Sequence, residues 1–365
     1  MITIRPYQTT DDAALIKLCN IPVSGDLVLA LERSPSYIAG SKIQTRKPQV
    51  YVCEDEKIGA VGVFNIGTRP AFVNEKMADV HYLCDLRIHP DFQNGSLFLR
   101  ILRFVASLNL NWNVLAAMTV VFADNQLMVE MIQKQAKKNI TGLPLYHQVA
   151  TITSFLFSSK NTFKSPPDYL IRRAESSDLE AMDHLREQEQ KHLAYAPFES
   201  MSANDQSYNQ GLSVQNYLII SEKSDPSTIL GFMALWDTSA IKTTRIIRYP
   251  FYLKALKAIL PLLSFLPLPI LPKGGGLLKT LYLHDIVIKD RSEPLFSALL
   301  SHICKTQNYP ANLLCTLDER DPLHSILKAK PWAIQKKGFV YLVNFSPELP
   351  QDFRGPYVVV DAARI

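Results

Sequence analysis

The chain has 365 residues, 47% of them hydrophobic and 20% charged, a composition typical of a globular protein with two or three domains. Its 39 basic and 34 acidic residues leave a net charge of +5, too small to indicate nucleic-acid binding by itself. Residues 1–6 lack the apolar region of a secretion signal, and the five cysteines are scattered without a CxxC or Cys/His spacing. We therefore expect a cytoplasmic protein with reduced thiols and no metal site.

The first part of the chain alternates between strand and helix patterns. A strand at 2–6 and a helix at 11–19 are followed by a polar helical region around 26–38. The remaining expected elements are strands at 50–54, 58–65 and 79–90, a helix at 97–108, a strand at 116–122, a helix at 125–134 and a strand at 145–157. This order predicts an α/β fold built on a mixed sheet.

The second part of the chain repeats the first. Residues 4–18 align without gaps on 171–185, and residues 82–88 align on 282–288. The expected elements of the repeat are strands at 169–173, 217–222, 229–236, 281–289, 313–317 and 338–345, and helices at 178–192, 294–306 and 323–328. Two tandem copies of one domain explain this repetition.

The expected boundaries follow from the repeat. One domain spans 1–157 and the other 168–346, and a polar, proline-containing linker joins them. An apolar insertion at 238–280 interrupts the second copy, and residues 347–365 form an extension that packs back on the domains.

Residues 88 to 97 lead from an apolar strand through a small polar loop into an amphipathic helix. The first turn of a helix offers unpaired N–H groups and a partial positive charge to an anion. Gly95 and Ser96 are small enough to let a pyrophosphate approach, and Asn94 tolerates a positive φ. An ordinary strand-to-helix connection with Ser96 as the N-cap fits the same residues.

This loop resembles the acyl-CoA-binding element of the GNAT acyltransferase superfamily. In that element an apolar residue, any residue, Pro, two residues and Gln or Arg precede a Gly-x-Gly that opens a helix. Ile88, Pro90 and Gln93 fit the pattern, whereas Asn94 and Ser96 stand at the glycine positions. The order of elements is also that of a tandem GNAT protein. The resemblance implies that acyl-CoA contacts Leu86, Ile88, Gln93, Asn94, Gly95, Ser96, Leu97 and Asn125.

Acyl transfer to an amine needs a base for the amine and an acid for the departing thiolate. Asp85, on the strand before the loop, is the first candidate for the base, followed by Tyr82 and then His81. A structural carboxylate bonded to Arg87 or to nearby backbone is the alternative, and the matching Asp285 favours it.

The general acid is not assigned by the resemblance. Many family members carry a Tyr about seven residues after an Asn that begins the helix, but here Ile132 follows Asn125 at that distance. Tyr146 and His147 are the candidate substitutes in the sequence.

The second copy lacks the features of the cofactor loop. Its connection, residues 289–294, is two residues shorter and has no glycine. Ser292 caps the next helix, and the Glu293 carboxylate in its first turn would repel a pyrophosphate. We expect acyl-CoA in the first copy, although the opposite assignment stays open.

The insertion at 238–280 is basic and apolar. Between residues 238 and 284 there are seven basic residues and no acidic one. The uncharged run at 258–272 contains four prolines and is shorter than the roughly 20 residues of a membrane span. It is a wall of an acyl pocket, a weak membrane-surface contact through 246–273, or a segment packed on the other domain.

The sequence leads to two hypotheses of function. The first is an acyl-CoA-dependent N-acyltransferase, with acetyl as the expected group and a small-molecule or peptide amine as acceptor. The second, favoured by the missing glycines and the missing Tyr, is a non-catalytic GNAT-like ligand-binding or regulatory protein. Nucleic acid is not an expected partner, because prolines and aliphatic residues, not stacking aromatic residues, separate the basic residues. The acceptor, the acyl chain length and the oligomeric state do not follow from the sequence.

Overall fold

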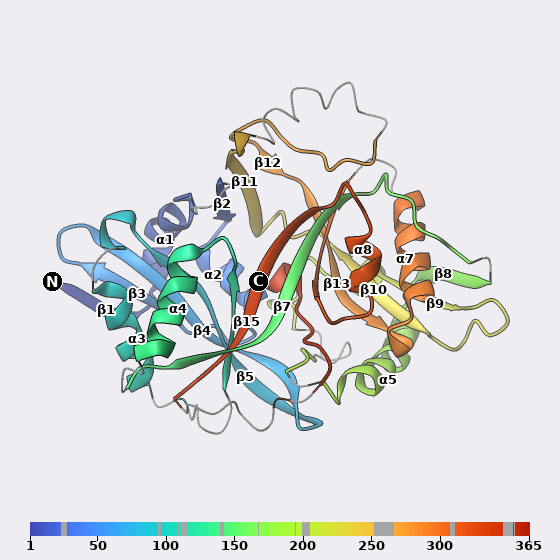
Figure 1. Cartoon of the computed structure of the whole chain (residues 1–365), viewed down its shortest axis with the longest axis horizontal. Coiled ribbons are helices and arrows are strands. Elements are labelled where there is room, and N and C mark those ends of the chain that lie inside the picture. Colours follow the sequence, from blue (N-terminus) through green and yellow to red (C-terminus); the bar gives the residue numbers. More distant parts are fainter. Residues whose placement is uncertain are drawn as a thin grey trace.

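The described residues form one large mixed sheet with helices on both faces, and a smaller sheet beside it (Figure 1). The structure is a computed structural model. It describes residues 1–22, 28–93, 96–108, 110, 116–138, 142–166, 168–193, 195–198, 205–251, 266–306, 311–345, 353 and 355–365.

The first half of the chain supplies seven strands and four helices among the described residues. They are β1 (Ile2–Pro6), α1 (Asp12–Cys19), β2 (Val28–Arg33), α2 (Tyr37–Gln44), β3 (Val50–Asp55), β4 (Gly59–Val73), β5 (Lys76–Ile88), α3 (Leu97–Ser107), β6 (Ala117–Phe122), α4 (Gln126–Lys138) and β7 (Leu145–Ser158). One expectation was wrong. The region around 26–38 contains strand β2 and the start of α2, not one helical segment, because β2 pairs with a strand more than 200 residues later.

The second half follows the expected order, and differs from the expected elements mainly at their ends. Its elements are β8 (Tyr169–Arg173), α5 (Leu179–Gln190), β9 (Tyr217–Glu222), β10 (Gly231–Trp236), β11 (Lys242–Arg248), β12 (Leu277–Leu278), β13 (Thr280–Ile288), α7 (Glu293–Thr306), β14 (Asn312–Asp318), α8 (His324–Lys328) and β15 (Ile334–Asn344).

The last strands of the two halves are exchanged. The 12-stranded sheet has the order β1-β3-β4-β5-β6-β15-β7-β14-β13-β10-β9-β8. Strand β15 of the second half lies between β6 and β7, and β7 of the first half pairs with β14. Figure 1 shows β7 and β15 running together through the middle of the molecule. The two expected domains therefore share one continuous sheet, and their boundaries stay a prediction.

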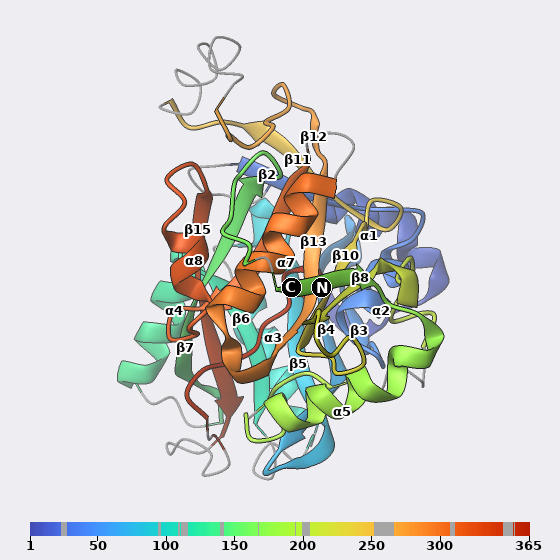
Figure 2. The same cartoon turned by 90° about the vertical axis from the view of Figure 1, so that its right-hand side faces the viewer.

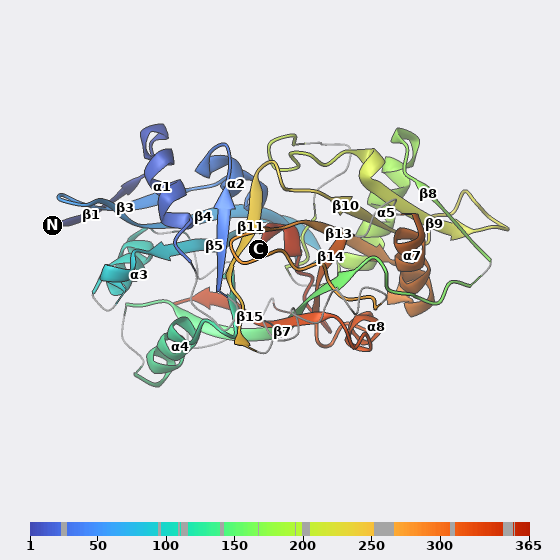
Figure 3. The same ribbon diagram turned by 90° about the horizontal axis from the view of Figure 1, so that it is seen from above.

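Alternating side chains give the sheet two apolar faces. On β9, Leu218 and Ile220 pack with the residues of α7, whereas Tyr217 and Ile219 pack with those of α5. Figures 2 and 3 show α5 and α7 on opposite sides of these strands. The sheet is therefore covered on both faces, as expected for strands that are apolar throughout.

The smaller sheet joins the insertion to the first half. Strand β11 lies between β12 and β2, and Thr244 is opposite Leu31. Strand β11 of the insertion thus packs on the first half. Most of the apolar run at 258–272 lies outside the described residues, as does the segment before it. No helix within the described ranges is long and apolar enough to cross a membrane.

The carboxyl-terminal extension returns to the centre of the molecule, as expected. Val358 and Val360 are buried in a cluster that also contains Val80 and Tyr82 of β5. Arg364 donates hydrogen bonds to the carbonyl of Ile43 and to the carbonyl of Tyr208, each at 2.8 Å. The extension therefore links the first half, through Ile43, to the second half, through Tyr208.

Candidate functional site

The two equivalent strands β5 and β13 carry the same backbone irregularity. Asp85 and Asp285 have φ values of 60° and 54°, and the register with the antiparallel neighbour, β4 for β5 and β10 for β13, shifts beside each of them. Asp tolerates this left-handed conformation better than most residues, and such a bulge re-aims the strand.

The parallel pairing of each strand ends two or three residues before its bulge. Pairing of β5 with β6 involves Tyr82 and Leu83, and pairing of β13 with β14 ends at Tyr282 among the described residues. Each half thus presents a strand end whose neighbour has moved away. Backbone groups at such an edge can bind an extended ligand.

The described residues of the predicted cofactor loop lie together at the end of β5. Leu86 and Ile88 are half-buried and pack with side chains of α3 and α4. The Gln93 amide donates to the Ile88 carbonyl at 3.0 Å. Ser96 precedes α3 without capping it through its side chain, and Leu97 is buried. Asn94 and Gly95 lie outside the described residues.

Two further predicted residues lie on later elements of the first half. The Asn125 side chain accepts a hydrogen bond from the Met128 N–H at 3.3 Å at the start of α4. Tyr146 at the start of β7 packs edge-on against Tyr341, with 6.1 Å between ring centroids. Burial raises the pKa of Tyr146, so its phenol is protonated at neutral pH.

The predicted base is held in a buried ion pair. The Asp85 carboxylate accepts hydrogen bonds from the Arg33 guanidinium and, at 3.0 Å, from the Tyr37 hydroxyl. Arg33 also donates to the side chain of Gln44 at 2.6 Å. The partner of Asp85 is thus an arginine of β2, not the expected Arg87 or nearby backbone.

Tyr82, the second candidate for the base, is buried beneath the Arg69 guanidinium. Its ring lies 3.3 Å from the Arg69 guanidinium carbon, and its residue is 2% exposed. Burial raises the pKa of Tyr82 to about 12, against the opposing effect of Arg69. Arg69 in turn donates to the carbonyls of Gln44 and Arg364, which ties β4 to α2 and to the carboxyl-terminal extension.

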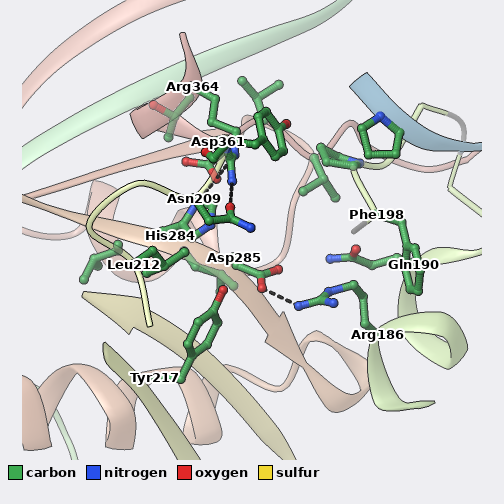
Figure 4. A pocket seen from close by; sticks show the side chains of 18 of the residues that line it. Arg186, Gln190, Phe198, Asn209, Leu212, Tyr217, His284, Asp285, Asp361 and Arg364 are labelled. Atoms are coloured by element: carbon green, nitrogen blue, oxygen red, sulfur yellow. Dashed lines mark hydrogen bonds and ion pairs between the residues drawn. The ribbon is translucent and has the colours of Figure 1, made fainter. Parts of the chain in front are cut away.

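A cavity of about 370 Å³ lies in the second half, where β13 and β14 diverge (Figure 4). Its walls come from α5, the segment before β9, the ends of β13 and β14, and the carboxyl-terminal extension. The residues that line it include Arg186, Gln190, Phe198, Tyr208, Asn209, Leu212, Tyr217, His284, Asp285, Ile286, Arg291, Asp321, Val359, Asp361 and Arg364.

Ion pairs cross the walls of this cavity. Arg186 of α5 binds the Asp285 carboxylate and, at 2.9 Å, that of Asp183. Asp361 is paired with His284. Burial would raise the pKa of Asp361, but His284, Arg364 and a backbone N–H together lower it to about 2.

Arg291 bridges the diverging strands of the second half. Its guanidinium donates to the Ile286 carbonyl of β13 at 3.1 Å and pairs with Asp321, which follows β14. Ile286 is the counterpart of Leu86. In the second half, the Arg291 side chain therefore occupies the strand edge that corresponds to the edge at Leu86 in the first half.

Sequence reasoning missed most of the residues around this cavity. The equivalence of Asp85 and Asp285 was visible in the repeat, but their partners Arg33 and Arg186 come from a strand in one half and a helix in the other. Gln190 carried no motif. Its only signal was a place one helical turn after Arg186 on α5.

Comparison with known proteins gave matches in structure alone. No protein-family model matches the sequence, and no curated protein matches it in sequence. A GCN5-related N-acetyltransferase from Sphaerobacter thermophilus is similar with a TM-score of 0.56 and 9% identity, over 97% of this chain and 98% of that chain.

Two further solved structures show the same likeness. A GCN5-related N-acetyltransferase from Anabaena variabilis has a TM-score of 0.51 and 11% identity, over 93% of this chain and 72% of that one. The glucosamine N-acetyltransferase region of a fungal multi-domain β-N-acetylglucosaminidase has a TM-score of 0.59 and 10% identity, over 94% of this chain and 38% of that one. At these identities the likeness concerns the fold.

Proposed function

We propose that this chain, which has the fold of the GCN5-related N-acetyltransferases, is an acyl-CoA-dependent N-acyltransferase with acetyl-CoA as its donor. The observation that carries the proposal is the strand edge of the first half. Pairing of β5 with β6 ends at Leu83, β5 bulges at Asp85, and the loop after Ile88 leads into the start of α3.

The proposed cofactor contacts use backbone groups. Leu86 and Ile88 hold the pantetheine arm along the free edge of β5, and the first N–H groups of α3 receive the pyrophosphate. The first turn of α3 carries no acidic residue, whereas the first turn of α7 carries Glu293. This difference supports a donor site in the first half.

The proposed reaction moves one acyl group and one proton. The amine nitrogen attacks the thioester carbon, the C–S bond breaks, and the thiolate leaves with a proton. Asp85 is the proposed base. Its carboxylate is paired with the Arg33 guanidinium and accepts a hydrogen bond from the Tyr37 hydroxyl. Tyr146 is the proposed acid, because burial keeps its phenol protonated, and Tyr82 stays the second candidate for the base.

Donor binding and thiol release test this proposal together. We expect isothermal titration to detect acetyl-CoA or a longer acyl-CoA, and a thiol-release assay over an amine panel to detect turnover. Asp85→Asn should lower turnover by about a hundredfold or more, whereas the matched variant Asp285→Asn should leave it near the wild-type rate. Absence of binding to any acyl-CoA would refute the enzyme function.

The alternative is a non-catalytic ligand-binding or regulatory protein. Two observations favour it: the cavity lies in the second half, and the Asp85 carboxylate is already paired with Arg33. Acyl-CoA binding without thiol release for any amine would support this alternative over catalysis.

The proposed setting is the cytoplasm, where the five free cysteines would stay reduced. The proposed acceptor is a small-molecule or peptide amine. A weak membrane-surface contact through residues 246–273 is also proposed. Ile247, Phe251 and Ile270 are exposed there, beside the exposed cations Arg248 and Lys273.

A further inference from the structure

We infer that the cavity in the second half binds a small, neutral, hydroxyl-rich molecule of about monosaccharide size, and that it does so without acyl-CoA. This inference goes beyond the proposed transferase activity, because it concerns the half that is not the proposed donor site. Four observations carry it: a closed donor side, balanced charges, an unpartnered acceptor and an aromatic wall.

The donor side of the cavity is closed by Arg291. This side chain spans the diverging ends of β13 and β14, bonds to the Ile286 carbonyl at 3.1 Å and pairs with Asp321. An extended thioester arm would have to displace that buried pair, which costs several kcal/mol. The cavity is therefore accessible to a compact ligand and not to the donor.

The charges that line the cavity are balanced by one another. Arg186 pairs with Asp285, Arg291 with Asp321, and Arg364 lies 3.9 Å from Asp361. Each lining guanidinium thus has a lining carboxylate as its neighbour. A charged ligand would bury its charge without an available counter-ion, which is costly. A neutral ligand avoids this penalty.

One acceptor in the cavity has no partner among the described residues. Gln190 is 4% exposed, and no described residue donates a hydrogen bond to its Oε1 atom. An unsatisfied buried acceptor is destabilising, so it indicates a missing donor. Figure 4 shows the Gln190 amide and the Arg186 guanidinium pointing from α5 toward Asp285. A ligand hydroxyl at this point can donate to Gln190.

The size and the apolar lining of the cavity fit a small sugar ring. Its volume of about 370 Å³ is near the lower end of the range of roughly 300–1,000 Å³ for small-molecule pockets. Phe198 and Tyr217 contribute aromatic surface, and Val359 contributes aliphatic surface. Such surfaces pack against the C–H faces of a sugar while its hydroxyl groups meet polar atoms at the rim.

Ligand-observed NMR titration with four monosaccharides tests the inference on the full chain. Glucose and N-acetylglucosamine are the neutral probes, glucosamine is the cationic probe and glucuronate is the anionic probe. We expect saturable binding of a neutral probe and at least about tenfold weaker binding of both charged probes. An excess of CoA should not displace the neutral probe.

Matched variants on one helix locate the binding. Gln190→Met keeps the side-chain length, removes the acceptor and should weaken the neutral probe by about tenfold. The control Gln188→Met, on the exposed side of α5, should leave binding unchanged. Leu212→Trp narrows the cavity and should abolish binding. Thermal unfolding of each variant shows whether a loss of binding comes from misfolding. If Gln190→Met does not fold, the result with Leu212→Trp tests whether the ligand binds in the cavity.

The outcomes separate this inference from the proposed function. Absence of saturable binding by all four probes, tighter binding of a charged probe, or full binding by folded Gln190→Met would each overturn it. Displacement by CoA would show that donor and ligand share one site, and would overturn the claim of independence. Acetyl-CoA binding is measured separately. A failure of the monosaccharide inference is therefore distinguishable from a failure of the proposed transferase function.

Discussion

At the scale of single residues, Asp85 and Asp285 show how one backbone position is stabilised in two ways. Both have a positive φ and both bind a buried guanidinium. Arg33 has Asp85 as its carboxylate partner, whereas Arg186 binds Asp285 and also Asp183. Removing the aspartate therefore has different consequences in the two halves.

Asp85→Asn should lower the free energy of unfolding by about 3 kcal/mol, because it leaves the buried Arg33 without a counter-ion. Asp285→Asn should cost less, about 1 kcal/mol, because Arg186 keeps Asp183. Urea denaturation of both variants at pH 7 measures the difference. Equal losses would mean that the second carboxylate does not compensate.

The pair of His284 and Asp361 gives a pH-dependent contribution. The pKa of Asp361 falls from 3.8 to about 2 in the folded chain. A carboxyl with a lowered pKa stabilises the fold above its unfolded value and loses that effect as the pH falls toward the folded value. Asp361→Asn should therefore cost roughly 2 kcal/mol at pH 7, and the gap from wild type should narrow from pH 5 to pH 3. A gap that stays constant over this range would contradict this origin of the stability.

At the scale of elements, most helices and strands could be predicted, and β2 could not. The period-two and helical patterns are local, so they locate α3 and β5 correctly. Strand β2 depends on pairing with β11, about 210 residues away, and no local pattern reports that partner. The Arg33 contact with Asp85 could not be predicted either, because it depends on where β2 lies.

The insertion carries the membrane prediction. Phe251 is 86% exposed and lies between basic residues, so it should add apolar contact with anionic vesicles. Phe251→Ser should reduce co-sedimentation with phosphatidylserine vesicles several-fold. The matched control Leu127→Ser, at a 60% exposed position on α4, should have no effect. Equal pelleting of wild type and Phe251→Ser would show that Phe251 does not contact the membrane.

At the scale of the whole molecule, the exchange of β7 and β15 makes the two halves dependent on each other. Without β15, the first half has a one-strand gap between β6 and β7. The repeat was visible in the sequence because it preserves residue identities, but the exchange was not, because either arrangement uses the same strands. The cavity was hidden for a similar reason, since its walls come from segments far apart in the chain.

Fragments test this dependence. Residues 1–160 and 161–365, expressed separately, should each lack cooperative unfolding, because each leaves strand edges unpaired in the middle of its sheet. Co-expressed, they should form a stable heterodimer with one transition by circular dichroism. A monomeric, cooperatively unfolding fragment 1–160 would show that β7 can close the first half alone.

Titration of acetyl-CoA into a pair of matched variants determines which half binds the donor. Ser96→Glu places a carboxylate before α3, and Ser292→Glu places one before α7. If the donor binds in the first half, Ser96→Glu should weaken acetyl-CoA binding by at least about tenfold, whereas Ser292→Glu should bind like wild type. Unchanged affinity in folded Ser96→Glu, or a loss confined to Ser292→Glu, would contradict a donor site at the end of β5.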